Sequence, residues 1–330
     1  MKLQSTQIAA GQTKLQQLVH SITEAIAKGE LKAGDPLPSV NQLSSESGFS
    51  RDTVFKAYNI LKQRSIVESA PTKGYFVANE SYRVFVLLDD FSAFKEQLYQ
   101  ALRQNLPESY SVDLLFHHYN RDVFAQLIES SLGRYSMYVV MNIDHQSMEP
   151  ILHKIDANKL LLLDMGKPDN DKVNYLLQDF GESVVKCLEE GAGQLSKYNE
   201  LVLIYSEKDT PHPVEVVPAI QSFCKTHSIQ FSRVGRFNSS QLKSGQAYFV
   251  IRDADLVEVI KSCRANQLEL GKQVGIISYN DTPMKQIVGG GITVISTNFE
   301  EMGHEVATFV QHKHKVGKVL STSLILRDSL

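Results

Sequence analysis

The first residues of the chain show the periodicity of an amphipathic helix. From residue 13 to residue 28, apolar positions recur every three or four residues, at Leu15, Leu18, Val19, Ile22 and Ile26. This spacing places them on one face of a helix, which we expect to end near Gly29. Pro36 and Pro38 then interrupt the pattern and predict a connecting turn.

Two further helices and a hairpin follow in the pattern. Ser39 can cap a short helix that Gly48 ends, and Ser50 can cap the next helix. In this third helix one face is apolar, with Val54, Tyr58 and Leu61, and the other carries Arg51, Asp52, Phe55, Lys56, Asn59 and Lys62. Residues 66–78, IVESAPTKGYFVA, are typical of two strands with Lys73 and Gly74 at the turn. The sequence predicts three helices followed by a β-wing.

From Tyr82 onward, apolar runs of strand length alternate with helical stretches. The runs are RVFVLL, MYVVM, KLLLL, LVLIY, AYFVIR and VGIIS. Strands that are apolar on both faces and separated by helices are typical of parallel sheets. Because there are too many runs for one small sheet, we expect a two-lobed α/β domain over residues 83–330. Residues 1–78 form the predicted N-terminal domain, and residues 79–82 the linker.

Composition and cysteine usage limit the class of protein. Hydrophobic residues make up 42% of the chain and charged residues 22%, which is ordinary for a soluble globular protein. The chain has no apolar stretch of about 18 residues, and MKLQSTQIAAGQTKLQQ lacks the apolar core of a secretory signal. We therefore expect a cytoplasmic protein without membrane association. Cys187, Cys224 and Cys263 are widely spaced, so we expect reduced, buried thiols.

The distribution of charge favours nucleic acid as the partner of the N-terminal region. Residues 1–80 carry nine Lys and Arg against seven Asp and Glu, whereas the remainder carries 25 against 30. Arg51 stands at a helix start, where the helix dipole disfavours positive charge, so a negative partner is expected there. A helix in the major groove reads bases near its own N-terminus, and arginine can bond to guanine O6 and N7.

The whole N-terminal region resembles a known family. The segments IAKGELKAGDPLPSVNQL, GFSRDTVFKAYNIL and TKGYFV together resemble the winged helix-turn-helix of the GntR family. The predicted DNA-contacting residues are Ser39, Asn41, Arg51, Thr53, Lys56, Asn59, Lys73 and Gly74. Asn41 stands where this family usually has a basic residue, Ser65 replaces its usual glycine, and Phe55 stands where arginine is common. Phe55 could pack on a thymine methyl or on the neighbouring helix, and the sequence leaves both readings open.

Polar residues follow the predicted strands of the α/β domain. In open parallel sheets, ligands bind beyond the carboxyl ends of the strands. The candidate ligand-binding residues at such positions are Phe91, Asn142, Gln178, Asp179, Arg252, Asp253 and Asn280. Amides, carboxylates and an arginine, with an aromatic ring to stack on, suit a polyhydroxylated ligand such as a sugar. The alternative is that Asp and Asn occur there because they form turns and cap helices.

The C-terminal part also resembles a known family. The segments AYFVIRDADLVEVI, VGIISYNDTPMKQIVGGGITVISTNFEEMGHEVATFV and LILRDS are similar to the ligand-binding domain of LacI/GalR repressors, which has a periplasmic-binding-protein fold. The resemblance places Arg252, Asp253 and Asn280 at sugar contacts, and Gln178 or Asp179 near another. Glu215 stands where that family often has a sugar-anchoring arginine, which implies a different hydroxyl pattern.

The two resemblances together indicate the arabinose-repressor subfamily. They imply a homodimeric repressor of carbohydrate-utilisation genes on a palindromic DNA operator, controlled by a sugar such as arabinose or fucose bound between the two lobes. No catalytic residues, cofactor or metal are expected. The alternative reading is a GntR-headed regulator whose C-terminal domain senses a non-sugar metabolite or acts as an enzyme-like pyridoxal phosphate module.

Overall fold

The chain forms two compact units in a computed structural model that describes residues 13–64, 66–78, 82–143, 145–166, 168, 172–208 and 213–330. The first unit contains the described residues up to Asp90, with Arg103–Tyr175 and Val306–Gly317. The second contains Phe91–Leu102, Leu176–Glu305 and Lys318–Leu330. The predicted linker lies outside the described residues apart from Tyr82, so the domain boundary stays a prediction.

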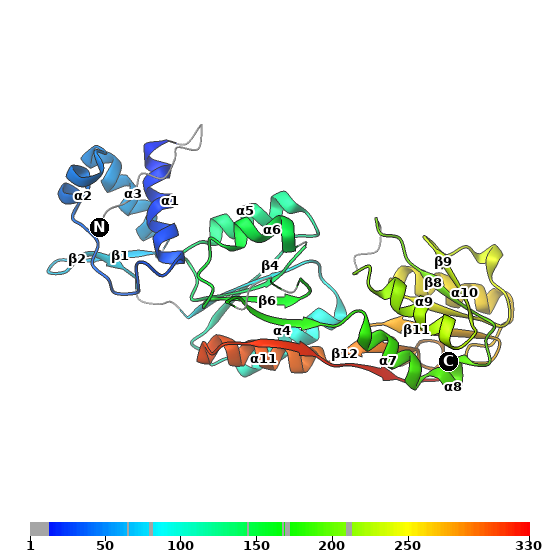
Figure 1. Cartoon of the computed structure of the whole chain (residues 1–330). Coiled ribbons are helices and arrows are strands. Elements are labelled where there is room, and N and C mark those ends of the chain that lie inside the picture. Colours follow the sequence, from blue (N-terminus) through cyan, green and yellow to red (C-terminus); the bar gives the residue numbers. More distant parts are fainter. Residues whose placement is uncertain are drawn as a thin grey trace. The chain divides into compact units, whose positions relative to one another are not determined.

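The head, residues 13–78, has the predicted three helices and wing (Figure 1). These are α1 (Lys14–Ala27), α2 (Val40–Ser47), α3 (Arg51–Gln63), β1 (Val67–Ala70) and β2 (Gly74–Val77), with the two strands antiparallel. Short-range caps set the helix bounds. The side chains of Thr13, Ser39 and Ser50 accept backbone hydrogen bonds at the three helix starts, and Gly48 ends α2 with φ 71°. The sequence-based prediction of this region is confirmed.

One apolar cluster holds the head together. Leu18 and Ile22 of α1, Leu43 of α2, and Val54, Tyr58 and Leu61 of α3 are all buried to 1% exposure or less. The hydroxyl of Tyr58 donates a 2.7 Å hydrogen bond to the carbonyl of Pro38, so α3 is tied to the turn before α2. Because Tyr58 and its apolar neighbours face this cluster, the opposite face of α3 points away from the core of the head.

The first sheet has the strand order β13-β7-β6-β5-β3-β4. Its strands are β3 (Arg83–Leu88), β4 (Ser111–Phe116), β5 (Met137–Met141), β6 (Leu160–Asp164), β7 (Asn174–Gln178) and β13 (Gly317–Leu320). Strand β3 pairs in parallel with β4 and β5, and β5 pairs in parallel with β6. On one face lie α5 (Arg121–Ser131) and α6 (His145–Leu152), with Phe124 and Leu152 in the same buried cluster as Tyr138 (Figure 1).

The second sheet has the order β14-β12-β11-β10-β8-β9. Its strands are β8 (Glu200–Ile204), β9 (Gln230–Val234), β10 (Gln246–Val250), β11 (Val274–Tyr279), β12 (Thr293–Thr297) and β14 (Thr322–Ile325). All pairs are parallel except β12 with β14. The other helices are α4 (Ala93–Asn105), α7 (Glu182–Glu190), α8 (Ala192–Leu195), α9 (Val216–Thr226), α10 (Asp253–Ala265) and α11 (Phe299–His312), with two 3₁₀ turns, η1 (Ser239–Gln241) and η2 (Val288–Gly290). The predicted α/β class with parallel sheets is confirmed.

The parallel register brings the strand ends together within each sheet. In the second sheet Val250 of β10 pairs with Ile204 of β8 and with Ser278 of β11. The segments that follow these strands therefore leave the sheet at one edge. The three cysteines are buried as expected, and burial raises the pKa of each thiol to about 11. Within the described ranges, no helix has the length and apolarity to span a membrane, and no group of His, Cys, Asp and Glu side chains could hold a metal ion.

Candidate functional site

The predicted DNA-contacting residues of α3 share its outer face. Arg51, Phe55 and Lys56 are exposed, and Thr53 and Asn59 are partly exposed. Ser50 accepts a hydrogen bond from the backbone amide of Thr53 and so fixes the helix start directly before Arg51. Lys56 forms an exposed 2.8 Å ion pair with Asp52, one helical turn earlier. This pair reduces the negative field of Asp52 on the face that also carries Arg51.

The other predicted DNA contacts lie at the start of α2 and in the wing. Ser39 accepts a 3.2 Å hydrogen bond from the amide of Gln42, and Asn41 is exposed in the first turn of α2. Lys73 lies in the turn between β1 and β2, with its ammonium 4.2 Å from the ring centroid of Phe76. Gly74 has φ 72° and pairs with Ala70, so it begins the second strand of the wing. The structure therefore places Lys73 at the tip of the wing, as predicted.

A buried lysine joins two of the predicted ligand-binding residues in the second unit. Asp253 begins α10 directly after Arg252, and Asn280 follows β11 with φ 59°. The side chain of Lys285 is only 5% exposed, and its ammonium lies 3.0 Å from a carboxylate oxygen of Asp253. The same ammonium donates to the carbonyls of Tyr279 and Asn280 at 2.8 and 2.9 Å. Burial lowers the pKa of Lys285, and the carboxylates of Asp253 and Asp281 oppose this effect.

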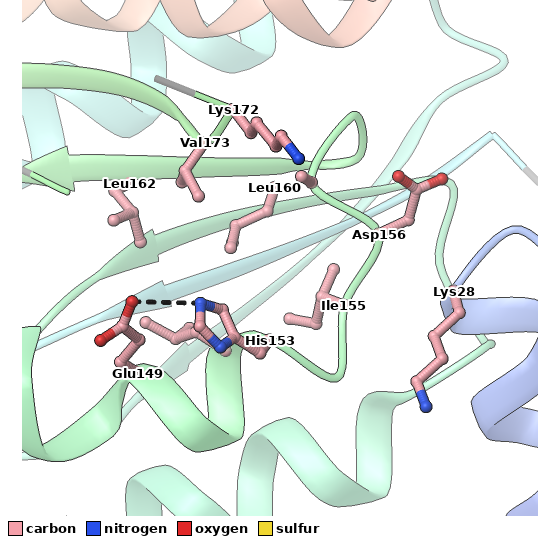
Figure 2. A pocket seen from close by; sticks show the side chains of 11 residues that line it. Lys28, Glu149, His153, Ile155, Asp156, Leu160, Leu162, Lys172 and Val173 are labelled. Carbon is pink, nitrogen blue, oxygen red and sulfur yellow. Dashed lines mark ion pairs between the residues drawn. The ribbon is translucent and has the colours of Figure 1, made fainter. Parts of the chain in front are cut away.

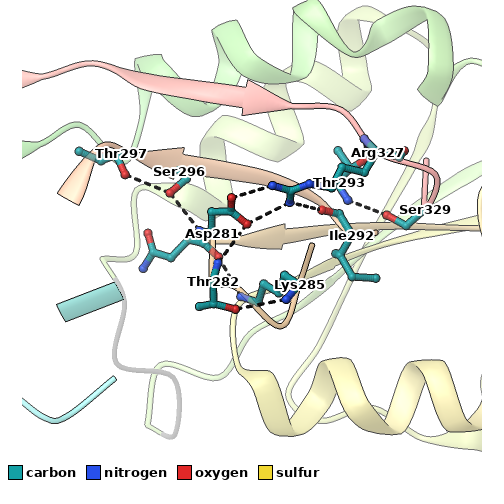
Figure 3. A network of polar contacts seen from close by, with 10 residues as sticks. Asp281, Thr282, Lys285, Ile292, Thr293, Ser296, Thr297, Arg327 and Ser329 are labelled. Atoms are coloured by element: carbon teal, nitrogen blue, oxygen red, sulfur yellow. Dashed lines mark hydrogen bonds and ion pairs between the residues drawn. The ribbon is translucent and has the colours of Figure 1, made fainter. Parts of the chain in front are cut away.

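A second charged network fixes the loop after β11 (Figure 3). Arg327 binds both carboxylate oxygens of Asp281, at 2.9 and 2.7 Å, and also donates to the carbonyl of Ile292 at 2.8 Å. The amide of Asp281 donates to the hydroxyl of Ser296. Bidentate arginine–carboxylate pairs hold both orientation and distance. The segment that carries Asn280 is therefore held from both sides, by Lys285 and by the pair of Asp281 with Arg327.

Some polar atoms near the strand ends lack protein partners. Asn142 directly follows β5 and is 1% exposed, and within the described residues its Nδ2 has no hydrogen-bond partner. The same holds for Oδ1 of Asn280 and for the hydroxyl of Ser278, the residue two positions before it. A buried polar group without a partner costs about 1–3 kcal/mol. These groups thus support a ligand or ordered water at the strand ends.

The other predicted ligand residues have varied surroundings. Gln178, the last residue of β7, is buried, whereas Phe91 is 67% exposed. Glu215 is exposed at the start of α9, and its side chain makes no capping hydrogen bond. The carboxylate of Asp179 accepts hydrogen bonds from the amides of Gly181 and Ser183 and from the Ser183 hydroxyl. Burial would raise the pKa of Asp179, but these hydrogen bonds hold it below its ordinary value. Asp179 therefore accepts amide hydrogen bonds at the start of α7, and its contact with a ligand stays a prediction.

Sequence reasoning missed two residues at the strand ends of the first unit. The hydroxyl of Tyr119 donates a 2.6 Å hydrogen bond to the buried carboxylate of Asp89, and its amide donates to Nδ1 of His117. Since that nitrogen accepts, Nε2 of His117 carries the proton and donates to the carbonyl of Met141. Both residues follow β4, an edge strand whose partly exposed sequence has no continuous apolar run. Residues 117–119, HHY, directly follow this strand, and this polar cluster is the sequence signal by which the two residues could have been found.

Two cavities that the described residues form lie elsewhere. One, of about 320 Å³, lies in the first unit (Figure 2). Its apolar wall includes Leu160 and Leu162, and at its charged rim His153 pairs with Glu149. Leu160 begins β6, so this cavity lies at the amino end of that parallel strand, opposite the edge at which Asn142 follows β5. The other, of about 520 Å³, lies at the amino ends of β8, β9 and β10. The predicted ligand-binding residues line neither cavity.

Two families match separate parts of the chain. Residues 14–77 match the bacterial regulatory proteins of the gntR family, and residues 196–330 match a periplasmic binding protein-like domain. The chain is 40% identical over 84 residues to the mannosyl-D-glycerate transport/metabolism system repressor MngR of Escherichia coli, covering 25% of this chain and 33% of that protein. The chain thus spans about a third of that repressor's length.

Two longer matches cover most of the chain. The HTH-type transcriptional regulator GalR of Streptococcus thermophilus is 23% identical over 342 residues, covering 89% of this chain and 99% of that protein. A LacI family transcriptional regulator from Lactobacillus casei with bound glucose has a TM-score of 0.61 at 14% identity, over 75% of this chain and 99% of that chain. At this identity the structural likeness shows the fold. The chain therefore consists of a GntR-family winged helix-turn-helix domain and a periplasmic binding protein-like domain with the fold of LacI-family regulators.

Proposed function

We propose that the protein is a cytoplasmic, homodimeric transcription repressor that binds a palindromic DNA operator and responds to a monosaccharide. The observation that carries this proposal is the presence, in one chain, of a winged head with an exposed face on α3 and a periplasmic binding protein-like domain. Similar proteins support it, since they include a repressor, a transcriptional regulator and a LacI family regulator with bound glucose. The match over residues 196–330 favours this function over a pyridoxal phosphate module.

The DNA half of the proposal rests on α3. Its outer face is exposed and begins with Arg51, whose charge at a helix start is best explained by an anionic partner. The first helical turn would contact base edges, while Ser39 and Asn41 at the start of α2 would contact phosphate. Lys73 at the wing tip would enter an adjacent minor groove. A two-fold dimer would place two such heads on the two half-sites of the operator.

The effector half rests on the strand ends. Among the described residues, Asn142 and Asn280 each have an amide atom without a protein partner, and Lys285 holds Asp253 beside the segment of Asn280. Groups of this kind suit sugar hydroxyls, and arabinose and fucose are the first candidates. A ligand that prefers one conformation of the protein would change operator affinity by a coupling free energy of about 1–3 kcal/mol, or 5- to 150-fold.

Changing Arg51→Ala is expected to remove about 1–3 kcal/mol of base discrimination, because a bidentate contact to one base would be lost. The measurement is a competition gel shift between the preferred duplex and single-base variants. Lys73→Ala is the matched control. It should weaken binding to all sequences alike, and the slope of log affinity against log salt concentration should fall by about one, the value for one phosphate contact. If the Arg51 variant discriminates among duplexes as well as the parent does, α3 is not the reading helix.

Changing Arg252→Ala is expected to abolish the response to sugar while leaving DNA affinity without sugar unchanged. The reason is that Arg252 lies at the ligand end of the second sheet, outside the head. The parent and variant are compared in gel-shift titrations with arabinose, fucose and glucose as effectors. If no sugar alters the parent's DNA affinity, the proposed sensing role fails. If the variant responds as the parent does, Arg252 does not contact the effector.

A further inference from the structure

We propose that Phe55 contacts the methyl group of a thymine in the major groove and thereby selects thymine at one position of each half-site. This proposal rests on the proposed DNA-binding function and adds the base chemistry that the head recognises. The sequence left two readings for Phe55, one toward DNA and one toward the neighbouring helix. The structure favours the first through the packing of α3.

The faces of α3 separate Phe55 from the core of the head. Its neighbours Val54 and Ala57 are fully buried, and so is Tyr58, whereas Phe55 is 50% exposed. The buried cluster of the head includes Val54, Tyr58 and Leu61 but not Phe55. The contacts with α1 and α2 are therefore made by the opposite face of the helix. A large aromatic ring is left half in water on the face that carries the predicted DNA contacts.

Phe55 lies between two polar residues that can contact DNA bases. Arg51, Phe55 and Asn59 follow one another at intervals of four residues, so they form one line along the exposed face. At about 1.5 Å per residue, the line is about 12 Å long. Arginine suits guanine, asparagine suits adenine, and an apolar side chain suits the methyl group of thymine. The three side chains together thus offer one partner for each of three different bases.

The charges around Phe55 favour DNA over a protein as the group that covers it. Arg51 lies one turn before it, and Lys56 lies next to it on the exposed face. The carboxylate of Asp52 is held by Lys56 at 2.8 Å, which reduces its repulsion of phosphate. An apolar ring flanked by cations matches a groove in which methyl groups lie between two rows of phosphates. A purely apolar partner surface would offer no anionic group to the guanidinium of Arg51.

The test removes the methyl group and nothing else. The full-length parent protein first selects its preferred site from a pool of duplexes with 20 randomised base pairs. Each thymine of the selected half-site is then replaced, one at a time, by deoxyuridine, which pairs identically but lacks the methyl group. Dissociation constants for these duplexes are measured by fluorescence anisotropy with the parent, with Phe55→Ala and with Lys62→Ala. Lys62 is an exposed residue at the other end of the same helix and serves as the control.

The expected result is a loss of about fourfold in the parent's affinity at one thymine of each half-site, the value of one buried methyl group. In Phe55→Ala the same replacement should have no effect, whereas Lys62→Ala should keep the fourfold effect. Because Phe55 is half exposed, its replacement should leave the thermal midpoint of the head close to that of the parent, which circular dichroism checks.

Four outcomes would overturn the proposal. The parent could tolerate deoxyuridine at every thymine, or the loss could persist in Phe55→Ala, which would place another group on the methyl. Phe55→Ala could instead leave DNA selection intact and change the oligomeric state in light scattering, which would place the ring in a protein interface. If the parent selects no duplex at all, the DNA-binding function fails, and this result is distinct because it appears before any thymine is replaced.

Discussion

Gly271→Ala is expected to destabilise the second unit by about 2–5 kcal/mol. Gly271 has φ 74°, a conformation that costs an L-residue about 1–2 kcal/mol. A Cβ at this position would also collide with the carbonyl oxygen of Asp328, and forced overpacking costs about 1–3 kcal/mol. The colliding atom belongs to the backbone, so it cannot move aside by a change of rotamer. Urea unfolding measures the effect as a lower midpoint.

Gly193→Ala is the matched control for this prediction. Gly193 lies in α8, and a Cβ there would meet nothing within 4 Å. The control should unfold at the same urea concentration as the parent or slightly above it, because alanine loses less backbone entropy on folding. An unchanged midpoint for Gly271→Ala would show that the C-terminal segment does not pack against this turn.

Arg327→Leu is expected to destabilise the second unit by about 2–4 kcal/mol. The change leaves the carboxylate of Asp281, whose side chain is only 20% exposed, without its bidentate partner. It also removes the donor to the carbonyl of Ile292. Breaking a buried pair from one side costs about 3–5 kcal/mol, and the partial exposure of this pair places the expected value somewhat lower. Urea unfolding with an unchanged slope would report the loss.

Two variants test whether the geometry of the pair matters. Arg327→Lys keeps the charge but cannot bind both oxygens of Asp281, so an intermediate loss is expected. Lys272→Leu removes an ion pair with Glu269 at the surface, and its stability should stay close to that of the parent. If Arg327→Leu is as stable as Lys272→Leu, the network around Asp281 does not hold the loop after β11.

Both predictions concern the C-terminal segment that carried the resemblance to LacI-type regulators. Besides Arg327 and Asp328, this segment contains Ser329, which is fully buried. The Ser329 hydroxyl accepts from the amide of Thr293 at 2.8 Å and donates to the carbonyl of Ile276 at 2.8 Å. The segment thus connects β11 and β12. The similarity of the motif LILRDS has a structural cause, since these side chains bind the second sheet.

Most of the head could be predicted from the sequence because its determinants are short-range. A cap such as Ser50 acts on an amide three residues away, and Gly48 ends a helix by its own conformation. The wing follows from strand and turn residues within one short segment. The edge strands β4 and β9 were not predicted from the sequence. Within the described sheets, each pairs with one neighbouring strand only and is partly exposed, so its sequence has no continuous apolar run.

The candidate ligand site could be predicted only in outline. The rule that ligands bind beyond strand ends identified Asp253 and Asn280 as candidates. It did not indicate that Lys285 holds them together, because a lysine in a sequence looks like a solvated side chain until its burial is known. The same reason applies to Asp179, whose carboxylate accepts hydrogen bonds from Ser183 in the first turn of α7.

The sequence by itself determined the three helix starts of the head, the α/β class and the cationic start of α3. Tertiary structure alone decided that Phe55 lies outside the head's core, that Lys285 is buried beside Asp253, and that Arg327 binds Asp281. The physical reason is the separation along the chain over which each interaction acts. Caps and periodicity act between residues a few positions apart, whereas burial and ion pairing between distant residues depend on the path of the folded chain.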